Sequence, residues 1–199
     1  AKTLFPYTTL FRSCHEFLMP GNSILEASES EIDEDIKIIE KKVGFKLDDE
    51  QRVALLGIAT SKTQLHTITA MPGCGKTAIM EFLAQMVKNE GGKMIAFMAP
   101  TGKASKVLDK RVKKVAKEFE AVTIHSAISY GNDDADGEVL DADVIVVDEF
   151  SMVDVQLMKM LLKKMKPTAH IVCVGDQDQL PSVGPGSVLR DLLRLPFDH

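Results

Sequence analysis

The chain has 199 residues, of which 45% are hydrophobic and 27% are charged, and its formal net charge is −5. This composition is typical of globular proteins and excludes a mainly disordered or collagen-like chain. No stretch approaches the roughly 18 uncharged apolar residues that a membrane-spanning helix needs, so we expect no membrane association. Taken alone, the negative charge argues against a nucleic-acid-binding protein. Cys14, Cys74 and Cys173 are too widely spaced for a zinc motif or a disulfide framework, which favours a reducing, cytoplasmic location.

Residues 1–13 do not fit the rest of the sequence. The run from Thr3 to Ser13 resembles, over all its length, the in-frame translation of a common sequencing adapter. We therefore exclude residues 1–13 from fold prediction as foreign to the protein, and we expect them to be disordered. The sequence is therefore expected to begin within a longer protein whose natural start is unknown.

Residues 14–44 are predicted to be a helical linker or the remnant of an N-terminal region. Apolar residues at helical spacing predict an amphipathic helix over 31–43, and Gly44 ends it. A second helix is expected to begin at Asp48 or Asp49, either of which can cap it, and to run to about Ala59.

From Leu65 onwards, short apolar runs alternate with helical segments. This alternation predicts an α/β fold with a mainly parallel sheet, because crossover helices connect parallel strands. Helices are expected over 76–89, 101–118 and 153–165. The expected strands are Leu65–Ala70, Met94–Ala99, Val144–Val147 and Ile171–Val174. Ligands of such sheets bind at the carboxyl ends of the strands.

A candidate phosphate-binding loop follows the first expected strand and precedes a helix. Its small residues allow backbone N–H groups to surround a polyphosphate at the helix N-terminus. Lys76 is expected to reach the β- and γ-phosphates of ATP, and the hydroxyl of Thr77 to bind Mg²⁺. Ala70 replaces the first glycine of the usual pattern, so a glycine-rich turn followed by a chance Lys-Thr pair is the alternative. The residues expected to bind ATP here are Pro72, Gly73, Cys74, Gly75, Lys76 and Thr77.

Two carboxylates, Asp148 and Glu149, follow the third expected strand. A buried strand that ends in two acidic residues is costly unless a charged partner is present. We expect Asp148 to bind Mg²⁺ and Glu149 to orient and deprotonate the attacking water. After the fourth strand, Gln179 can sense the γ-phosphate because its amide both donates and accepts hydrogen bonds. A polar loop explains Gln179 equally well.

A basic segment follows the second expected strand. Between Thr101 and Lys117 there are seven basic residues and one acidic residue, a local charge of +6. We predict that its first residues, Thr101, Gly102 and Lys103, contact the phosphate backbone of DNA. The rest of this helix can equally be a solvated face.

Together these motifs resemble the RecD-like group of superfamily 1 DNA helicases, over about residues 45–195. The Gly175–Asp191 run is the most specific part of the match, and Phe150 departs from it, since the family more often has Ala there. A weaker match, Cys14–Pro20, resembles the segment before the motor in RecD2-type proteins. The matching segments, in chain order, are Leu47–Gln51, Ala70–Thr77, Ala99–Lys106, Val122–His125, Val147–Asp154 and Gly175–Asp191.

The resemblance implies a three-layer α/β/α, RecA-like P-loop NTPase domain over residues 45–199. It also implies that Gln51 contacts adenine and that His125 lies near DNA. The catalytic residues implied are Lys76, Asp148, Glu149 and Gln179, with ATP and Mg²⁺ as cofactors.

By this resemblance the chain is the first motor domain of a 5′-to-3′ helicase of DNA repair or recombination. Its expected partners are single-stranded DNA, a second RecA-like domain of the same protein and the subunits of a nuclease complex. Without the second domain we expect weak Mg-ATP binding, very slow turnover and no unwinding. Two alternatives are a Dda-like or relaxase-type helicase of a phage or plasmid, and a P-loop module that binds nucleotide without translocation.

Overall fold

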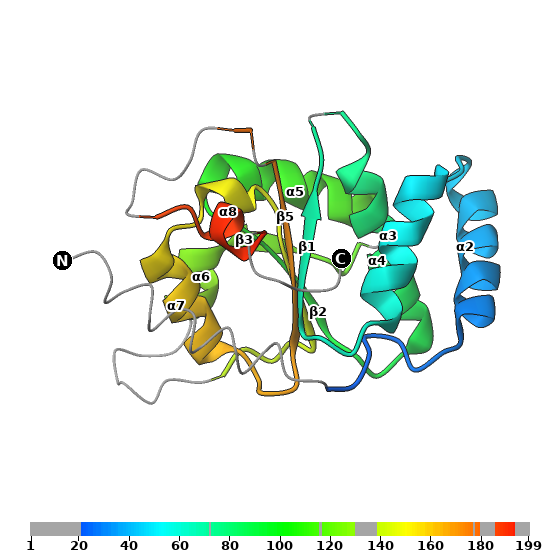
Figure 1. The fold of residues 1–199 in the computed structure, drawn as a ribbon, viewed down its shortest axis with the longest axis horizontal. Coiled ribbons are helices and arrows are strands. Elements are labelled where there is room, and N and C mark those ends of the chain that lie inside the picture. The colour runs from blue at the N-terminus through cyan, green and yellow to red at the C-terminus, as the bar shows by residue number, and fades with distance from the viewer. Residues whose placement is uncertain are drawn as a thin grey trace.

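A single sheet of five parallel strands organises the computed structural model, which describes residues 21–71, 73–115, 117–129, 139–176, 178–179 and 186–193. The strand order is β1-β5-β4-β2-β3 (Figure 1). Every residue of β4 and β5 is buried, which is why Val144–Val147 and Ile171–Val174 are continuous apolar runs. The strands are β1 (Leu65–Thr69), β2 (Ile95–Ala99), β3 (Ala121–Thr123), β4 (Val144–Val147) and β5 (His170–Gly175).

Helices cover both faces of this sheet, because successive strand residues point to opposite sides. On β4, Val144 and Val146 belong to one hydrophobic cluster, whereas Ile145 and Val147 belong to the other. The first cluster includes residues of α3 (Asp49–Thr60), α4 (Lys76–Glu90) and α5 (Gly102–Val115). The second includes residues of α6 (Ile124–Ser129), η1 (Phe150–Met152), α7 (Val155–Lys164) and α8 (Val188–Leu192). The predicted three-layer α/β/α fold is confirmed.

Helix α2 (Glu29–Val43) packs on α3 and α4, and it lies outermost in Figure 1. It begins two residues before the predicted helix because Ser28 and Glu31 form a capping box. The guanidinium of Arg52 on α3 donates to Asp33 and, at 3.0 Å, to Glu40, which attaches the two helices to each other. The predicted domain boundaries at residues 13 and 44 stay predictions, and residues 1–13 lie outside the described residues.

The sequence failed to predict the shortest elements. Strand β3 has three residues, and α6, η1 and α8 have three to six, too few for a periodic apolar pattern. The helix expected over 101–118 ends at Val115, and the one expected over 153–165 is α7 preceded by η1. No helix among the described residues has the length and apolarity needed to cross a bilayer.

The register of the sheet brings the carboxyl ends of all five strands to one edge. This carboxyl edge therefore collects the loops that follow β1, β5, β4, β2 and β3, in that spatial order. The pairs along it are Thr69 with Gly175, Val147 with Cys173 and Met98, and Ala99 with Thr123.

Candidate functional site

The loop between β1 and α4 takes a conformation that requires glycine. Gly73 and Gly75 have φ values of 86° and 74°, a left-handed region that L side chains rarely occupy. A Cβ atom at Gly75 would also lie 2.0 Å from Nε2 of Gln51. The loop ends at the N-terminus of the 15-residue helix α4, where free backbone N–H groups and the helix dipole favour an anion. The substitution of the usual first glycine by Ala70 does not prevent this geometry.

The side chain of Lys76, the first residue of α4, folds back over the loop. Its Nζ donates to the carbonyl oxygen of Ala70 and, at 3.2 Å, to that of Met71. Its ammonium group is therefore held over the loop whose N–H groups would bind a polyphosphate. Cys74 is exposed in the same loop, and its contact with ATP stays a prediction, while Pro72 lies outside the described residues.

Gln51 contacts this loop from α3, and both ends of its amide are engaged within the protein. Its Oε1 accepts the backbone N–H of Asp48 at 3.1 Å in a capping box, while its Nε2 donates to the carbonyl of Cys74 at 3.3 Å. The structure thus places Gln51 against the candidate phosphate-binding loop. Its contact with adenine stays a prediction, and making it would require the amide to leave at least one of these partners.

Strand β4 delivers Asp148 and Glu149 to the carboxyl edge. The N–H of Asp148 continues the sheet ladder to the carbonyl of Met98 at 2.9 Å, and the N–H of Glu149 donates to Oδ1 of Asp148 at 2.9 Å. Glu149 has φ 54° and ψ 37°, and no other non-glycine residue in the described chain has a positive φ. Such backbone strain costs of the order of 1–3 kcal/mol and tends to occur at functional sites.

Both carboxyl groups are held in an environment that disfavours their charge. Burial raises the pKa of Asp148, and burial followed by repulsion from Asp148 raises the pKa of Glu149. The positive charges of Lys76 and Arg111 oppose these shifts. Neither carboxylate forms a salt bridge to a residue of the described chain. A cation bound there would supply the missing partner.

Oxygen donors at this site fit a magnesium ion. Mg²⁺ prefers hydroxyl, carboxylate, phosphate and water oxygens, and it is commonly held by one or two protein groups together with substrate phosphates. The hydroxyl of Thr77 and the carboxylate of Asp148 are such groups. Within the described residues no three His, Cys, Asp or Glu side chains gather into a metal cage.

Gln179 reaches the same edge through the loop that follows β5. Its Oε1 accepts the hydroxyl of Ser151, two residues beyond Glu149, at 3.3 Å. The segment that carries Ser151 also approaches Gly175 closely, since a Cβ there would lie 2.8 Å from Cδ2 of Leu189 and 3.1 Å from the backbone nitrogen of Ser151. Gln179 is therefore attached to the segment that carries the two carboxylates.

Two residues at this site were not identified from the sequence. Ser151 donates a hydrogen bond to Gln179, and although it lies in the matching segment Val147–Asp154, no role was predicted for it. Arg111 lay in the basic run that we considered for DNA binding, but its Nη1 donates to Oγ1 of Thr77 at 3.2 Å. A helix that starts beside the nucleotide site and packs on α4 has one flank facing that site, and this is the signal that could have found Arg111.

The residues predicted to contact DNA gather farther along the carboxyl edge, at the ends of β2 and β3. Thr101 caps α5, since its Oγ1 accepts the N–H of Ala104 at 3.2 Å, and Gly102 and Lys103 are exposed. His125 is exposed on α6, directly after β3. Because β2 and β3 pair in parallel, these residues emerge from adjacent strands. The structure brings the four predicted residues to one end of the edge.

A family model for an AAA domain matches residues 46–196, which is most of the chain. The chain belongs to this family. Among relatives of this AAA-domain chain, RecD, a RecBCD enzyme subunit of Mycobacterium tuberculosis, is 35% identical over 168 residues, covering 73% of this chain and 28% of its own. The ATP-dependent RecD2 DNA helicase of Deinococcus radiodurans is 32% identical over 157 residues, covering 77% and 21%.

The ATP-dependent DNA helicase dda of Enterobacteria phage T4 is 34% identical over 130 residues, covering 60% of this chain and 28% of its own. The AAA-domain chain thus spans less than a third of the length of these three relatives. In fold it is similar to the UvsW helicase of bacteriophage T4, with a TM-score of 0.58 and 11% identity over 77% of this chain and 62% of the other. The recognition of a RecD-like first motor domain is confirmed by the family match and the RecD and RecD2 relatives.

Proposed function

We propose that this chain is the ATP-binding half of a DNA helicase that couples ATP hydrolysis to 5′-to-3′ translocation on single-stranded DNA in repair or recombination. The observation that carries the proposal is the convergence at one sheet edge of an anion-binding loop and two partly buried carboxylates that form no salt bridge to any described residue. The AAA-domain family and the RecD and RecD2 relatives support the same class.

The residues that follow β1, β4 and β5 have separate roles in ATP hydrolysis in this proposal. The loop N–H groups and Lys76 would bind the phosphates, and Thr77 and Asp148 would hold Mg²⁺, which would supply positive charge to the phosphate oxygens. Glu149, whose pKa is raised by burial and by Asp148, accepts the proton of the attacking water. Gln179 reports the state of the γ-phosphate through its contact with Ser151.

The residues at the β2 and β3 ends bind DNA in this proposal. Thr101, Gly102 and the N-terminus of α5 contact a backbone phosphate, Lys103 supplies a positive charge, and His125 contacts the strand from α6. A second RecA-like domain is proposed to close over the nucleotide, and subunits of a nuclease complex are proposed as further partners, as the name of the RecD relatives suggests. The cytoplasmic location stays a prediction.

The test is to measure Mg-ATP binding, single-stranded DNA binding and ATPase activity of the chain and of Glu149→Gln. We expect saturable binding of both ligands and slow hydrolysis that Glu149→Gln lowers further, by at least about tenfold. Absence of Mg-ATP binding would contradict the proposal. Nucleotide binding without any DNA binding would favour a P-loop switch module. Robust DNA-stimulated hydrolysis by the chain alone would contradict the need for a second domain.

A second candidate within the same class is a Dda-like helicase of a phage or plasmid, which the similarity to the T4 dda helicase favours. The chemistry of the site would be the same. The Gly175–Asp191 run argues for the RecD-like alternative by its resemblance, although residues 180–185 lie outside the described residues. The uninterrupted gene and its neighbours would distinguish the two, since a phage or plasmid origin shows in the flanking genes.

A further inference from the structure

Helix α2 precedes the part of the chain that the family model matches, which begins at residue 46. One face of α2 is nevertheless buried, since Ile32, Ile36 and Ile39 are each at most 1% exposed. These side chains belong to the same hydrophobic cluster as residues of α3 and α4, and the three helices lie side by side in Figure 1. Helix α2 is therefore packed into the same core as the helices that border the candidate phosphate-binding loop.

A buried carboxylate on α2 holds the first turn of α3. Oε1 of Glu40, which is 7% exposed, accepts the backbone N–H of Leu47 at 3.1 Å and Nη2 of Arg52 at 3.0 Å. Because Leu47 precedes the N-cap residue Asp48 and Arg52 follows it by four positions, Glu40 contacts the chain on both sides of the cap. The other guanidinium nitrogen of Arg52, Nη1, donates to Asp33. We call Asp33, Glu40 and Arg52 the α2–α3 clamp.

The same turn of α3 contacts the loop between β1 and α4. Gln51 directly precedes Arg52, and its Nε2 donates to the carbonyl of Cys74 at 3.3 Å. The approach is close, because a Cβ atom at Gly75 would lie 2.0 Å from the same nitrogen. A hydrogen bond is lost when the two heavy atoms are about 3.6 Å apart, so even a small shift of the turn would break this contact. The position of α3 therefore determines whether Gln51 can hold the loop.

The clamp fixes the direction of α3 more than it adds to the stability of the chain. Replacing a buried ion pair by uncharged residues is often neutral or stabilising, because the pair costs desolvation. A guanidinium, however, presents its N–H groups in a rigid planar fork, and Arg52 uses this fork to bind two carboxylates of α2 at once. Two contacts from one planar group restrict both the distance and the orientation of the helices.

We propose that Glu40 and Arg52 are positioning residues for the nucleotide site. The α2–α3 clamp holds the first turn of α3 so that Gln51 binds the carbonyl of Cys74 and keeps the loop in the conformation that receives phosphates. Part of the nucleotide affinity thus depends on α2, a helix that precedes the family match. This inference rests on the proposed function, and it adds to that function two residues that lie behind the site and do not touch the nucleotide.

The test measures Mg-ADP affinity by calorimetric titration of the chain and of variants at the clamp. Arg52→Met keeps much of the apolar stem and removes the fork, so the affinity should fall by about threefold to tenfold. Arg52→Lys retains a charge that can bind one carboxylate but not both, and it should give a smaller loss. Lys166→Met is the control, since it breaks ion pairs with Asp141 at 2.6 Å and Asp143 at 3.3 Å at the amino end of the sheet. It should leave the affinity within about twofold.

The double variant Glu40→Gln with Arg52→Met separates positioning from stability, and it keeps the proposal testable if Arg52→Met fails to fold. It removes both charges, so neither is left buried without its partner, and the midpoint of thermal unfolding should lie above that of Arg52→Met alone. Because the fork is still absent, Mg-ADP affinity should stay as low as in Arg52→Met. A merely structural role predicts instead that affinity recovers together with stability.

Amide NMR of the ligand-free chain reports the loop directly. The backbone signals of Cys74 and Gly75 and the side-chain amide of Gln51 should shift in the double variant and stay unchanged in Lys166→Met. Unchanged loop signals in the double variant, or an affinity that recovers with stability, would overturn the inference while leaving the proposed function in place. If the unmodified chain binds no Mg-ADP, the proposed function fails and this inference fails with it.

Discussion

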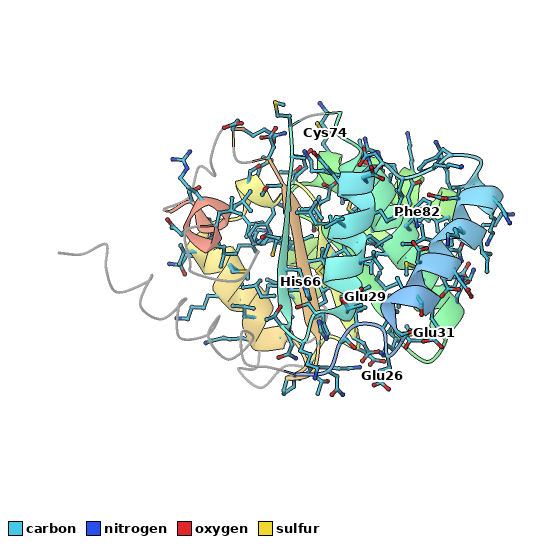
Figure 2. The ribbon with its side chains drawn as sticks, turned by 45° about the vertical axis from the view of Figure 1, so that its right-hand side comes forward. Glu26, Glu29, Glu31, His66, Cys74 and Phe82 are labelled. Carbon is cyan, nitrogen blue, oxygen red and sulfur yellow. The ribbon has the colours of Figure 1, made fainter. Side chains whose placement is uncertain are left out.

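Both ends of the central strands bury polar side chains, but the two ends differ in the partners that the protein provides for them. At the amino end, His66 on β1 and His170 on β5 stack, with Nε2 and Nδ1 3.2 Å apart, and Gln64 donates to the carbonyl of Pro167 at 2.7 Å. At the carboxyl end, Asp148 and Glu149 have no salt-bridge partner within the described chain. Figure 2 shows Cys74 near the carboxyl end of β1 and His66 nearer its amino end.

This difference separates a structural site from a binding site. Titratable groups at both ends have shifted pKa values: burial lowers the pKa of His66 to about 3, and burial raises the pKa of Asp148. Perturbed titration alone therefore does not identify function. At the amino end each imidazole is satisfied by the protein in its neutral form. At the carboxyl end the carboxylates of Asp148 and Glu149 have no salt bridge to a described residue, so a bound cation can neutralise them.

The largest expected effect is the loss of nucleotide binding when Lys76 is substituted. Lys76→Ala removes a charged donor, so Mg-ATP affinity should fall by about tenfold to a hundredfold, with little change in stability. Lys103→Ala is the matched control, since it removes one lysine from the same sheet edge. It should leave nucleotide affinity within about twofold and weaken DNA binding. Calorimetric titration measures both affinities, and equal losses of nucleotide affinity would contradict the division of the edge.

Acid should lower the free energy of unfolding of the chain through the two histidines at the amino end. Because the folded-state pKa of His66 is about 3, below its ordinary value of 6.5, the unfolded chain takes up a proton first as the pH falls. Stability is therefore complete above about pH 6.5 and is lost from there towards pH 3, by about 2 kcal/mol for His66 at pH 5. Lowering of the His170 pKa by burial acts in the same direction. Urea unfolding at pH 5, 6 and 7 measures the slope.

The control is the double variant His66→Leu with His170→Leu, which removes both imidazoles and leaves neither without its partner. Its stability should depend much less on pH between 5 and 7. The carboxyl end responds with the opposite sign, because the raised pKa values of Asp148 and Glu149 make their protonation easier in the folded chain. An unchanged slope in the double variant would show that other groups cause the acid sensitivity.

A substitution at Gly175 tests whether the carboxyl edge of the sheet is tightly packed. Gly175→Ala would bring a Cβ to 2.8 Å from Leu189 and 3.1 Å from the Ser151 backbone, so it should destabilise the chain by about 1–2 kcal/mol. Gly57→Ala on α3 is the control, because a Cβ there meets nothing within 4 Å. It should stabilise the chain by about 0.5–1 kcal/mol. Thermal unfolding compares the two, and equal effects would contradict the close approach at Gly175.

The smallest expected effect is a gain of stability at the cost of function. Asp148→Asn removes a charge that the carboxyl end disfavours while keeping an oxygen for the Glu149 N–H, so it should stabilise the chain by about 0.5–1 kcal/mol at pH 7. It should also abolish the effect of Mg²⁺ on nucleotide binding. Chemical denaturation without ligand measures the first effect. A loss of stability would indicate that Asp148 already has a stabilising partner.

Much of this architecture could be predicted from the sequence. The strand positions of β1, β4 and β5 could be predicted because each contains a short apolar run. The sequence therefore also predicted that the residues after these strands share one edge: Lys76 and Thr77 after β1, Asp148 and Glu149 after β4, and Gln179 after β5. The roles of these residues stay predictions. For these elements the local sequence was sufficient, because the strand, the loop and the helix can each be recognised from neighbouring residues alone.

The rest depends on contacts between segments that are distant in sequence. Gln51 forms a hydrogen bond with Cys74, 23 positions away, and Arg111 forms one with Thr77, 34 positions away. No local sequence pattern predicts either contact. Strand β3 exists because Ala121–Thr123 pairs with β2, not because three residues favour a strand. The His66–His170 pair was likewise invisible, since its members are 104 positions apart.

The central claim is that the carboxyl end of β1 and β4 binds Mg–nucleotide, and amide NMR shifts on titration with Mg-ADP test it most directly. The account predicts saturable shifts at Gly73–Thr77 and at Asp148–Glu149, absent in Lys76→Ala, while Gln64, His66 and His170 at the amino end stay unchanged. Absence of saturable shifts at the loop, or shifts that centre on the amino end, would contradict it.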